Sequence, residues 1–254
     1  MSVLNEIINE RKKDLAAARI LTKKPTEPTN KNFIEALQRK NKIPALIAEL
    51  KRKSPSKGDI RPEITVEEAV KIYEPYAAAL SILTEPRYFG GSLNDLALAA
   101  AFTKKPLLRK DFLIDPVQVK ESRLFGADAY LLIAAALSDS QLQEMIEAGK
   151  DFNMPALVEV HNEEETERAL NQNIKILGIN NRNLSDLSID LNNTANILKI
   201  IPKEKLNNLI IVSESGFQNK EQLENLPSDV NAVLMGTAFM QAENPQDLIS
   251  SIFS

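Results

Sequence analysis

From Pro44 onward, the sequence alternates short apolar runs with longer amphipathic segments. The apolar runs have the length of buried strands, and the amphipathic segments repeat apolar residues every three or four positions, as helices do. The expected strands are Ala45–Leu50, Ala79–Leu83, Pro106–Leu108, Ala129–Ile133, Ala156–Val160, Ile174–Ile179, Leu209–Val212 and Ala232–Met235. The expected helices are Val66–Tyr76, Leu93–Phe102, Pro116–Phe125, Ser140–Phe152, Glu163–Leu170, Thr194–Ile200, Lys220–Leu226 and Pro245–Ile252.

Eight strand–helix pairs in strict alternation are typical of a closed α/β fold, the (β/α)8 TIM barrel. The alternative is an open doubly wound sheet, which usually carries a glycine-rich phosphate loop after its first strand. Only 8 glycines occur in the chain, and none of them forms a GxGxxG motif. The pattern therefore favours the barrel.

Several expected helices begin at residues that cap helix N-termini well. Ser92, Asp115 and Asn162 are candidate N-caps, and Asn244–Pro245 places a proline in a first turn. We expect Asp115 to have this structural role only.

The segment before Pro44 predicts two more helices, Leu4–Ile20 and Phe33–Gln38, joined by the loop Thr22–Asn32. One stripe of the first helix is apolar, which suits docking against the barrel. We therefore expect one (β/α)8 barrel domain over residues 1–254, with 1–43 as an N-terminal helical extension. The residues of the stripe are Leu4, Ile7, Ile8, Leu15 and Ile20.

The composition excludes several classes of protein. The longest apolar run, Ala129–Leu137, has nine residues, whereas a membrane-spanning helix needs about 20. The absence of cysteine excludes disulfides and thiolate sites, and the single histidine, His161, excludes a histidine-rich metal site. The N-terminus lacks the apolar core of a signal peptide, so we expect a cytoplasmic protein without membrane association.

Charge is distributed unevenly, because residues 1–43 carry a net +5 and the remainder −9. A basic N-terminal segment can bind nucleic acid. Here acidic residues are interleaved and no aromatic platform accompanies them, which is typical of a solvated helix face. We expect no nucleic-acid partner.

The functional groups of a (β/α)8 barrel gather where its strands end. Six of the predicted strands end in charged, hydroxyl or glycine residues. Glu49 and Lys51 face the same way because side chains alternate along a strand, and so do Asn180 and Arg182 if the strand continues. Mixed acids and bases in one cleft shift each other's pKa values. A surface ion pair explains any one of these lysines, but the whole set favours a catalytic mouth that also includes Lys110, Glu159 and Glu214.

Two glycine-containing strand ends, Ser215–Gly216 and Gly236–Thr237, lie where barrels commonly bind phosphate. The glycines could instead only shape turns. Lys53 and Ser56 are expected across the mouth, which favours phosphate.

Phe89 and Phe112 follow the second and third strands. They either pack within their loops or form the wall of a flat apolar pocket that suits an aromatic substrate. His161 is expected on the side of Glu159, as a residue behind the site and without a catalytic role.

At these residues the chain resembles the indole-3-glycerol-phosphate synthase family of tryptophan biosynthesis. The resemblance runs in register from about Pro44 to the C-terminus. Its most specific parts are Lys-x-Ser-Pro-Ser, Asn-Asn-Arg-Asn-Leu and Ser-Glu-Ser-Gly. The segments that carry it are Ile47–Gly58, Leu80–Glu85, Tyr88–Ser92, Leu108–Phe112, Gly126–Ala129, Leu157–His161, Gly178–Leu184 and Val212–Gly216.

The resemblance implies a lyase, EC 4.1.1.48, that acts without a metal or organic cofactor. Its substrate would be 1-(2-carboxyphenylamino)-1-deoxyribulose 5-phosphate, which closes to an indole ring with loss of carbon dioxide and water. The chemistry requires an acid for the ketone oxygen, stabilisation of a cationic intermediate, and an acid/base pair for dehydration.

Carried over by position, the resemblance implies Lys110 as the general acid of ring closure and Glu159 as the carboxylate that stabilises positive charge or acts as a base. Lys51 and Glu49 would complete dehydration. The resemblance implies substrate orientation by Asn180, Arg182 and Glu214, phosphate binding by Ser215, Gly216, Gly236 and Thr237, and an anthranilate pocket of Phe89 and Phe112.

Two other functions remain open at this point. One is a different phosphosugar barrel enzyme, such as an aldolase that forms a Schiff base at Lys110. The other is a non-catalytic binding barrel, although a binder has no need of Lys51, Lys110 and Glu159 together. The expected partner is a small phosphorylated substrate, and we expect a monomer with a homodimer as the alternative.

Overall fold

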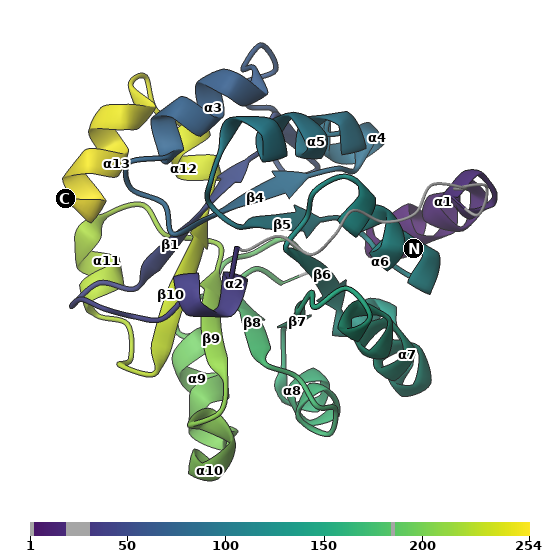
Figure 1. The fold of residues 1–254 in the computed structure, drawn as a ribbon. Coiled ribbons are helices and arrows are strands. Elements are labelled where there is room, and N and C mark those ends of the chain that lie inside the picture. The colour runs from purple at the N-terminus through teal and green to yellow at the C-terminus, as the bar shows by residue number, and fades with distance from the viewer. Residues whose placement is uncertain (1–2, 19–30, 184–185) are drawn as a thin grey trace.

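The computed structural model describes residues 3–18, 31–183 and 186–254. Eight parallel strands close a barrel in the order β1-β10-β9-β8-β7-β6-β5-β4, which confirms the (β/α)8 prediction (Figure 1). These strands are β1 (Ala45–Leu50), β4 (Ala79–Leu83), β5 (Leu107–Lys110), β6 (Ala129–Ile133), β7 (Ala156–Val160), β8 (Ile176–Asn180), β9 (Ile210–Glu214) and β10 (Val230–Met235).

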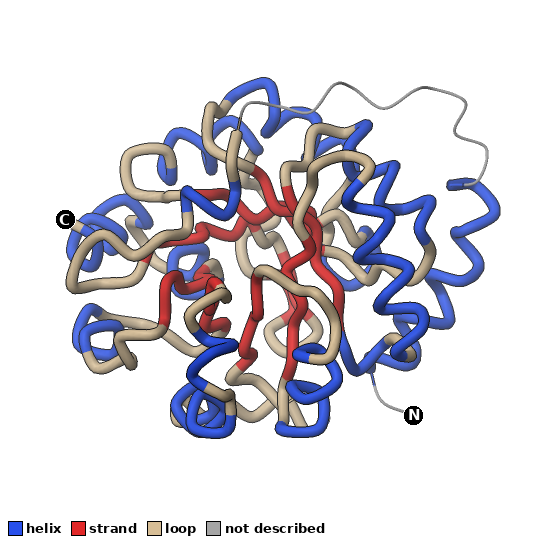
Figure 2. The backbone as a smooth tube through the Cα atoms, turned by 60° about the horizontal axis from the view of Figure 1, so that its bottom comes forward, coloured by secondary structure: helices blue, strands red, loops and turns tan. Residues whose placement is uncertain are grey.

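Helices surround the strands on the outside, as Figure 2 shows. The expected caps Ser92, Asp115, Asn162 and Asn244 each accept a hydrogen bond from a backbone N–H of the first turn. The main helices are α3 (Val66–Tyr73), α5 (Leu93–Phe102), α6 (Pro116–Leu124), α7 (Asp139–Lys150), α8 (Glu163–Leu170), α9 (Asn193–Ile200), α11 (Lys220–Glu224) and α13 (Pro245–Phe253).

The alternation of side chains divides the core into two layers. The larger layer lies between the strands and the outer helices, and a smaller apolar cluster contains Ile47, Leu108, Leu157 and Val212. Because side chains alternate, the residue two positions further along each strand points the same way. This continuation brings Glu49, Lys110, Glu159, Asn180 and Glu214 to the carboxyl end of the barrel interior.

The amino end of the barrel is closed by α2 (Phe33–Ala36). Phe33 and Leu37 are fully buried in the inner apolar cluster. Arg39 follows them and donates hydrogen bonds to the carbonyls of Pro227 and Val230, just before and at the start of β10. This end of the barrel is therefore sealed by apolar packing.

The N-terminal helix α1 (Val3–Ala18) packs against α6 and η1 (Ala134–Ala136). Within the predicted apolar stripe, Leu4 and Ile7 are buried, whereas Ile8 and Leu15 are half-buried. Ile20 and most of the expected loop Thr22–Asn32 lie outside the described residues. Polar contacts add to the packing, including an ion pair between Arg11 and Asp111.

Short elements account for most differences from the expected pattern. β5 continues through Lys110, beyond the predicted end at Leu108, and α3 ends at Tyr73 instead of Tyr76. Two-residue strands and single helical turns are too short to show a periodicity. The unpredicted elements are β2 (Lys53–Ser54), β3 (Gly58–Asp59), α4 (Pro86–Phe89), η1, α10 (Lys203–Leu206) and α12 (Thr237–Gln241).

The search for membrane spans over the described residues found no helix of sufficient length and apolarity.

Candidate active site

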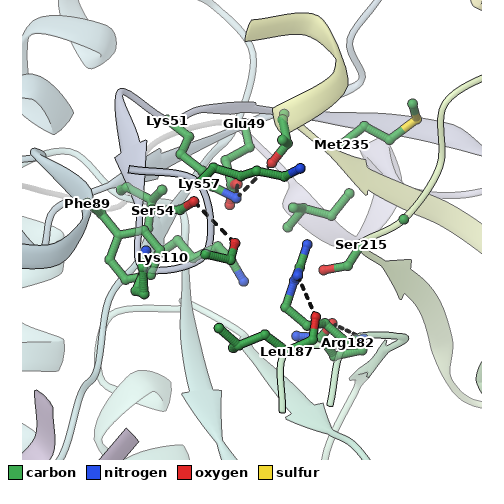
Figure 3. A pocket seen from close by; sticks show the side chains of 18 of the residues that line it. Glu49, Lys51, Ser54, Lys57, Phe89, Lys110, Arg182, Leu187, Ser215 and Met235 are labelled. Carbon is green, nitrogen blue, oxygen red and sulfur yellow. Dashed lines mark hydrogen bonds and ion pairs between the residues drawn. The ribbon is translucent and has the colours of Figure 1, made fainter. Parts of the chain in front are cut away.

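A cavity of about 270 Å³ opens at the carboxyl ends of the strands. Figure 3 shows Glu49 and Lys51 on one side of it and Arg182, Leu187 and Ser215 on the other. Strand ends, the loops after them and α1 all contribute to its wall. The cavity therefore lies where the strand-end residues were expected to meet.

Lys110 is held between two carboxylates at the carboxyl end of the barrel interior. Its Nζ lies 3.1 Å from Glu159 Oε2 and 3.1 Å from Glu214 Oε2. The three side chains come from β5, β7 and β9, so the closed sheet alone brings them together. The Lys110 side chain is 15% exposed, and both glutamates are buried.

Burial and charge act in opposite directions on these groups. Burial disfavours the ammonium form of Lys110, but the charges of Glu159, Glu214 and Glu49 outweigh it and raise its pKa. Burial alone would raise the pKa of Glu159, yet Lys110, His161 and a hydrogen bond from Asn180 lower it. Lys110 is therefore a cation and Glu159 an anion near neutral pH.

Glu214 behaves differently from Glu159. Burial raises its pKa to about 7, because the attraction of Lys110 is offset by repulsion from Glu159. Its Oε2 accepts from Lys110, whereas its buried Oε1 has no hydrogen-bond partner among the residues that the structure describes. The site thus contains one carboxyl group whose charge changes near pH 7.

A glycine makes room for this carboxyl group. A Cβ at Gly178 of β8 would lie 2.3 Å from Glu214 Oε1 and 2.5 Å from Leu157 Cδ2. No side chain fits in that space without moving the carboxylate.

Glu49 and Lys51 form a second ion pair, with Nζ 2.6 Å from Oε1. Their shared orientation agrees with the expected alternation, and Lys51 Nζ also reaches Thr237 Oγ1 at 3.5 Å. Arg52 points away and forms a two-pronged ion pair with Asp95 of α5. The loop after β1 is thereby fixed with Lys51 directed at the cavity.

The ends of β9 and β10 line the opposite part of the mouth. Ser215 has a φ of 70°, a left-handed conformation that is uncommon for a residue with a side chain and that clusters at functional sites. A Cβ at Gly236 would lie 2.7 Å from the carbonyl oxygen of Glu49, so this glycine permits close contact between β10 and β1.

Asn180 and Arg182 follow β8 into the cavity. The Arg182 N–H donates to Asn180 Oδ1 at 3.0 Å, and Arg182 Nη1 donates to the carbonyl of Leu187 at 2.8 Å. Burial lowers the pKa of Arg182, although its guanidinium remains charged.

Phe89 and Phe112 lie side by side on one wall, with ring centroids 6.1 Å apart. This arrangement fits the expected flat apolar pocket.

The predicted site residues fall into three groups. Glu214 is bonded to Lys110 and does not line the cavity itself. Lys53 does not line it either, and its side chain lies beside Gly90. The others all line it: Glu49, Lys51, Ser56, Phe89, Lys110, Phe112, Glu159, Asn180, Arg182, Ser215, Gly216, Gly236 and Thr237.

Lys53 was expected across the mouth from the phosphate-binding strand ends. The chain instead turns at Arg52 and enters the β2–β3 hairpin, which is antiparallel and pairs Lys53 with Asp59. Lys57 of the hairpin lines the cavity. A lysine facing the mouth is therefore present four residues later.

Other lining residues were missed by the sequence analysis. Leu4 and Ile7 of α1 reach the mouth from a segment far away in sequence, and their local pattern indicated only docking. Leu131 was identifiable as an inward position of β6, because it lies in the predicted strand. Ser54, Lys57, Leu187 and Gln241 are on irregular or short segments without such a signal.

Among the described residues, no group of three or more His, Asp or Glu side chains has a geometry that could hold a metal ion.

Comparison with known proteins identifies the family. A family model described as indole-3-glycerol phosphate synthase matches residues 4–252. The chain belongs to the indole-3-glycerol phosphate synthase family. It is accordingly an enzyme of tryptophan biosynthesis, a carboxy-lyase of class EC 4.1.1.48, that acts on a phosphorylated small molecule.

Individual relatives agree with this assignment. An indole-3-glycerol phosphate synthase from Dechloromonas aromatica is 40% identical over 265 aligned residues, covering 99% of each chain. The tryptophan biosynthesis protein TrpCF of Buchnera aphidicola from Acyrthosiphon pisum is 43% identical over 213 residues, which cover 84% of this chain and 46% of that protein.

A solved 3-hexulose-6-phosphate synthase from Salmonella typhimurium has a TM-score of 0.61 at 15% identity, covering 82% of this chain and 96% of that one. At that identity the likeness concerns the barrel fold alone.

Proposed function

We propose that the cavity carries out the synthase reaction with Lys110 as the general acid of ring closure. The observation that carries this proposal is the position of Lys110 Nζ, 3.1 Å from both Glu159 and Glu214 at the cavity. An ammonium group held there can donate a proton to the ketone oxygen while the ring carbon attacks the ketone carbon. One carbon–carbon bond forms, and the oxygen becomes a hydroxyl.

Glu159 is proposed to stabilise the cation that ring closure creates. Its carboxylate is buried and ionised, so it offers a fixed negative charge in a water-poor site, where such a charge is most effective. Departure of carbon dioxide then returns the bonding electrons to the ring and removes the positive charge.

Dehydration is assigned to the Glu49–Lys51 pair. The two groups are 2.6 Å apart, so Lys51 can protonate the leaving hydroxyl while Glu49 takes up a proton from the ring system. The hydroxyl leaves as water and the indole double bond forms. Within the described part of the chain, Glu49 Oε2 is buried without a hydrogen-bond partner, which leaves an acceptor for that proton.

Substrate binding is proposed to divide between the two sides of the mouth. Phe89 and Phe112 would hold the anthranilate ring, and Asn180 and Arg182 would orient the substrate. Phosphate is assigned to Ser215, Gly216, Gly236 and Thr237, with Lys57 and Ser56 across the cavity. Glu214 would hold Lys110 in position.

The proposal is tested by mixing the purified protein with 1-(2-carboxyphenylamino)-1-deoxyribulose 5-phosphate in buffer that contains a chelator. The chain has no tryptophan, so indole formation appears as new fluorescence over a weak background. We expect turnover at substoichiometric enzyme for the natural chain. K110A should lower kcat by roughly 10²–10⁴-fold with its fold retained.

The control variant is K71Q, because Lys71 is an exposed lysine on α3. The kcat of K71Q should equal that of the natural chain. If K110A kept the kcat of the natural chain, the assignment of Lys110 as the acid would be refuted. If the natural chain formed no product, the proposed reaction itself would be refuted.

An aldolase mechanism would require a neutral amine on Lys110 as the nucleophile. The two neighbouring carboxylates raise the pKa of Lys110 and so keep it protonated, which favours the acid role. Borohydride with a carbonyl substrate should leave the enzyme untrapped and active, and a trapped Lys110 adduct would indicate the aldolase.

We also propose that the enzyme works as a monomer in the cytoplasm, without nucleic acid, and that residues 1–254 form one domain. The buried Phe33 and Leu37 tie the N-terminal segment to the barrel, which supports a single domain. Light scattering on the eluting protein should give a mass near 28.3 kDa. Calorimetry should show a single unfolding transition.

A further inference from the structure

His161, the only histidine of the chain, lies directly after β7 and only two residues beyond Glu159. Its side chain is 8% exposed. From its place in the sequence, His161 was expected to have no part in catalysis. Its contacts in the structure indicate a specific role.

Both ring nitrogens of His161 face carboxylate oxygens. Nδ1 lies 3.0 Å from Glu165 Oε2 and is hydrogen-bonded to it. Nε2 lies 3.2 Å from Glu159 Oε1, which is an ion-pair distance, but it forms no hydrogen bond among the described residues. A carboxylate only accepts hydrogen bonds and a neutral imidazole has one N–H, so only an imidazolium presents an N–H to each carboxylate.

The ring itself is held from two elements. Glu165, in the first turn of α8, also accepts from the His161 backbone N–H, and its other oxygen accepts from Asn162. Asn193 of α9 donates to the His161 carbonyl at 3.2 Å. The start of α8 thus fixes the position of the imidazole relative to Glu159.

Each carboxylate oxygen of Glu159 consequently has a cationic side chain beside it. Lys110 holds Oε2 and His161 faces Oε1. We propose that His161 is a positioning residue, an imidazolium that fixes the orientation and the negative charge of Glu159 for the cationic step. This inference rests on the proposed function of Glu159.

The charge balance of the site supports the inference. Facing Glu159 are the cations Lys110 of β5 and His161 and the carboxyl group of Glu214 of β9, which interacts with it directly, whereas Glu49 of β1 acts through Lys110. Lys110 is shared with Glu214 and Glu49, so it neutralises Glu159 only in part. Burial opposes a charged imidazole, yet hydrogen bonds and charges from Glu159 and Glu165 raise the pKa of His161 to about 10. A second cation is therefore available at neutral pH.

The decisive variant is H161Q, which keeps a donor toward Glu159 and removes the charge. A misplaced catalytic group costs up to about 10²-fold in rate, so we expect kcat to fall roughly 10–100-fold with KM within about threefold. H161R, which restores a positive charge beside Glu159, should recover part of the lost kcat, whereas a purely structural role would not depend on the charge.

The control is E147Q, because Glu147 is exposed on α7. Its kcat and KM should equal those of the natural enzyme. A lowered melting temperature in H161Q with the kcat of the natural enzyme, or equal kcat values in H161Q and H161R, would mean a purely structural role and would overturn the proposal.

A second measurement does not depend on activity. One histidine gives one imidazole resonance set, so its titration by NMR is unambiguous. We expect both ring nitrogens to be protonated at pH 7.5, and E159Q to lower the His161 pKa by at least about one unit. A neutral ring at pH 7.5 would overturn the proposal. An inactive natural enzyme with the expected titration would instead refute the proposed function and leave the His161–Glu159 coupling in place.

Discussion

Two buried ionic networks meet at neighbouring residues of β5. Lys110 points into the barrel toward Glu159 and Glu214, whereas Arg109 points outward and contacts Asp111 and Glu121. Both networks contain one buried cation between two carboxylates. They differ in how completely their polar atoms are paired.

In the outer network each polar group of Arg109 has a partner. Its Nε donates to Thr84 and its Nη atoms reach Gln118, Ser122 and the two carboxylates. Asp111 in turn accepts from Thr84 Oγ1 at 2.6 Å and from the Phe112 N–H, and pairs with Arg11. This network joins β5, α6 and α1, and every side-chain nitrogen of its central Arg109 is engaged.

In the inner network, some polar atoms remain unpaired. Glu214 Oε1 and Glu49 Oε2 are buried without a hydrogen-bond partner among the described residues. Unpaired buried polar atoms destabilise a fold, and they persist where function needs them. The comparison indicates that saturation of a buried charge distinguishes a structural ion cluster from a catalytic one.

The strongest test of this distinction is R109M. It leaves Asp111 and Glu121 without their central cation, which should lower the free energy of unfolding by about 3–5 kcal/mol. Denaturant unfolding measures the loss. K110A, the equivalent change in the inner network, should cost less than half as much because Glu214 can take up a proton. Equal losses in the two variants would contradict the comparison.

E214Q should change the free energy of unfolding by a smaller amount than R109M and in the opposite direction, toward higher stability. The folded-state pKa of Glu214, about 7, lies above its ordinary 4.5, so the fold favours the protonated carboxyl. Stability from this group is fully present below pH 4.5 and is lost as the pH rises through 7. E214Q mimics the protonated form and should be more stable than the natural chain by about 2 kcal/mol at pH 8.

That gain in E214Q should disappear near pH 4.5, while kcat falls because Lys110 loses one of its charged partners. Thermal unfolding at several pH values measures the difference. A constant gain across this range would show that Glu214 does not titrate near neutrality.

The smallest effects come from a matched pair of hydroxyl deletions at β4. Thr84 donates to Asp111 and accepts from Arg109, so T84V should cost about 1–3 kcal/mol. Ser81 lies in β4 with a buried Oγ that has no partner in the structure, so S81A should be neutral or slightly stabilising. The prediction fails if unfolding shows S81A to be the more damaging change.

The barrel could be predicted from the sequence because its signal is local. Each buried run such as Ala129–Ile133 marks a strand, and strict alternation with helices fixes the parallel topology. The positions of Glu49, Lys110 and Glu159 followed from the rule that barrel chemistry lies at strand ends.

The rest depended on contacts that no local pattern contains. Lys53 was misplaced because a two-residue strand has no periodicity. Leu4 and Ile7 reach the cavity only once α1 docks, and one contact of that docking joins Arg11 to Asp111, 100 residues further along the chain. His161 gained its proposed role from the carboxylate of Glu165, a contact made by the start of α8.

Gly178 has a consequence for protein engineering. Its missing side chain is the space that Glu214 occupies, since a Cβ there would lie 2.3 Å from Oε1. Anyone who transplants this catalytic set onto another eight-stranded barrel has to copy a void as well as the reactive groups. A scaffold with alanine at the position equivalent to Gly178 would displace the carboxylate and thereby Lys110. The design of such a site therefore requires a glycine at this position in addition to the reactive side chains.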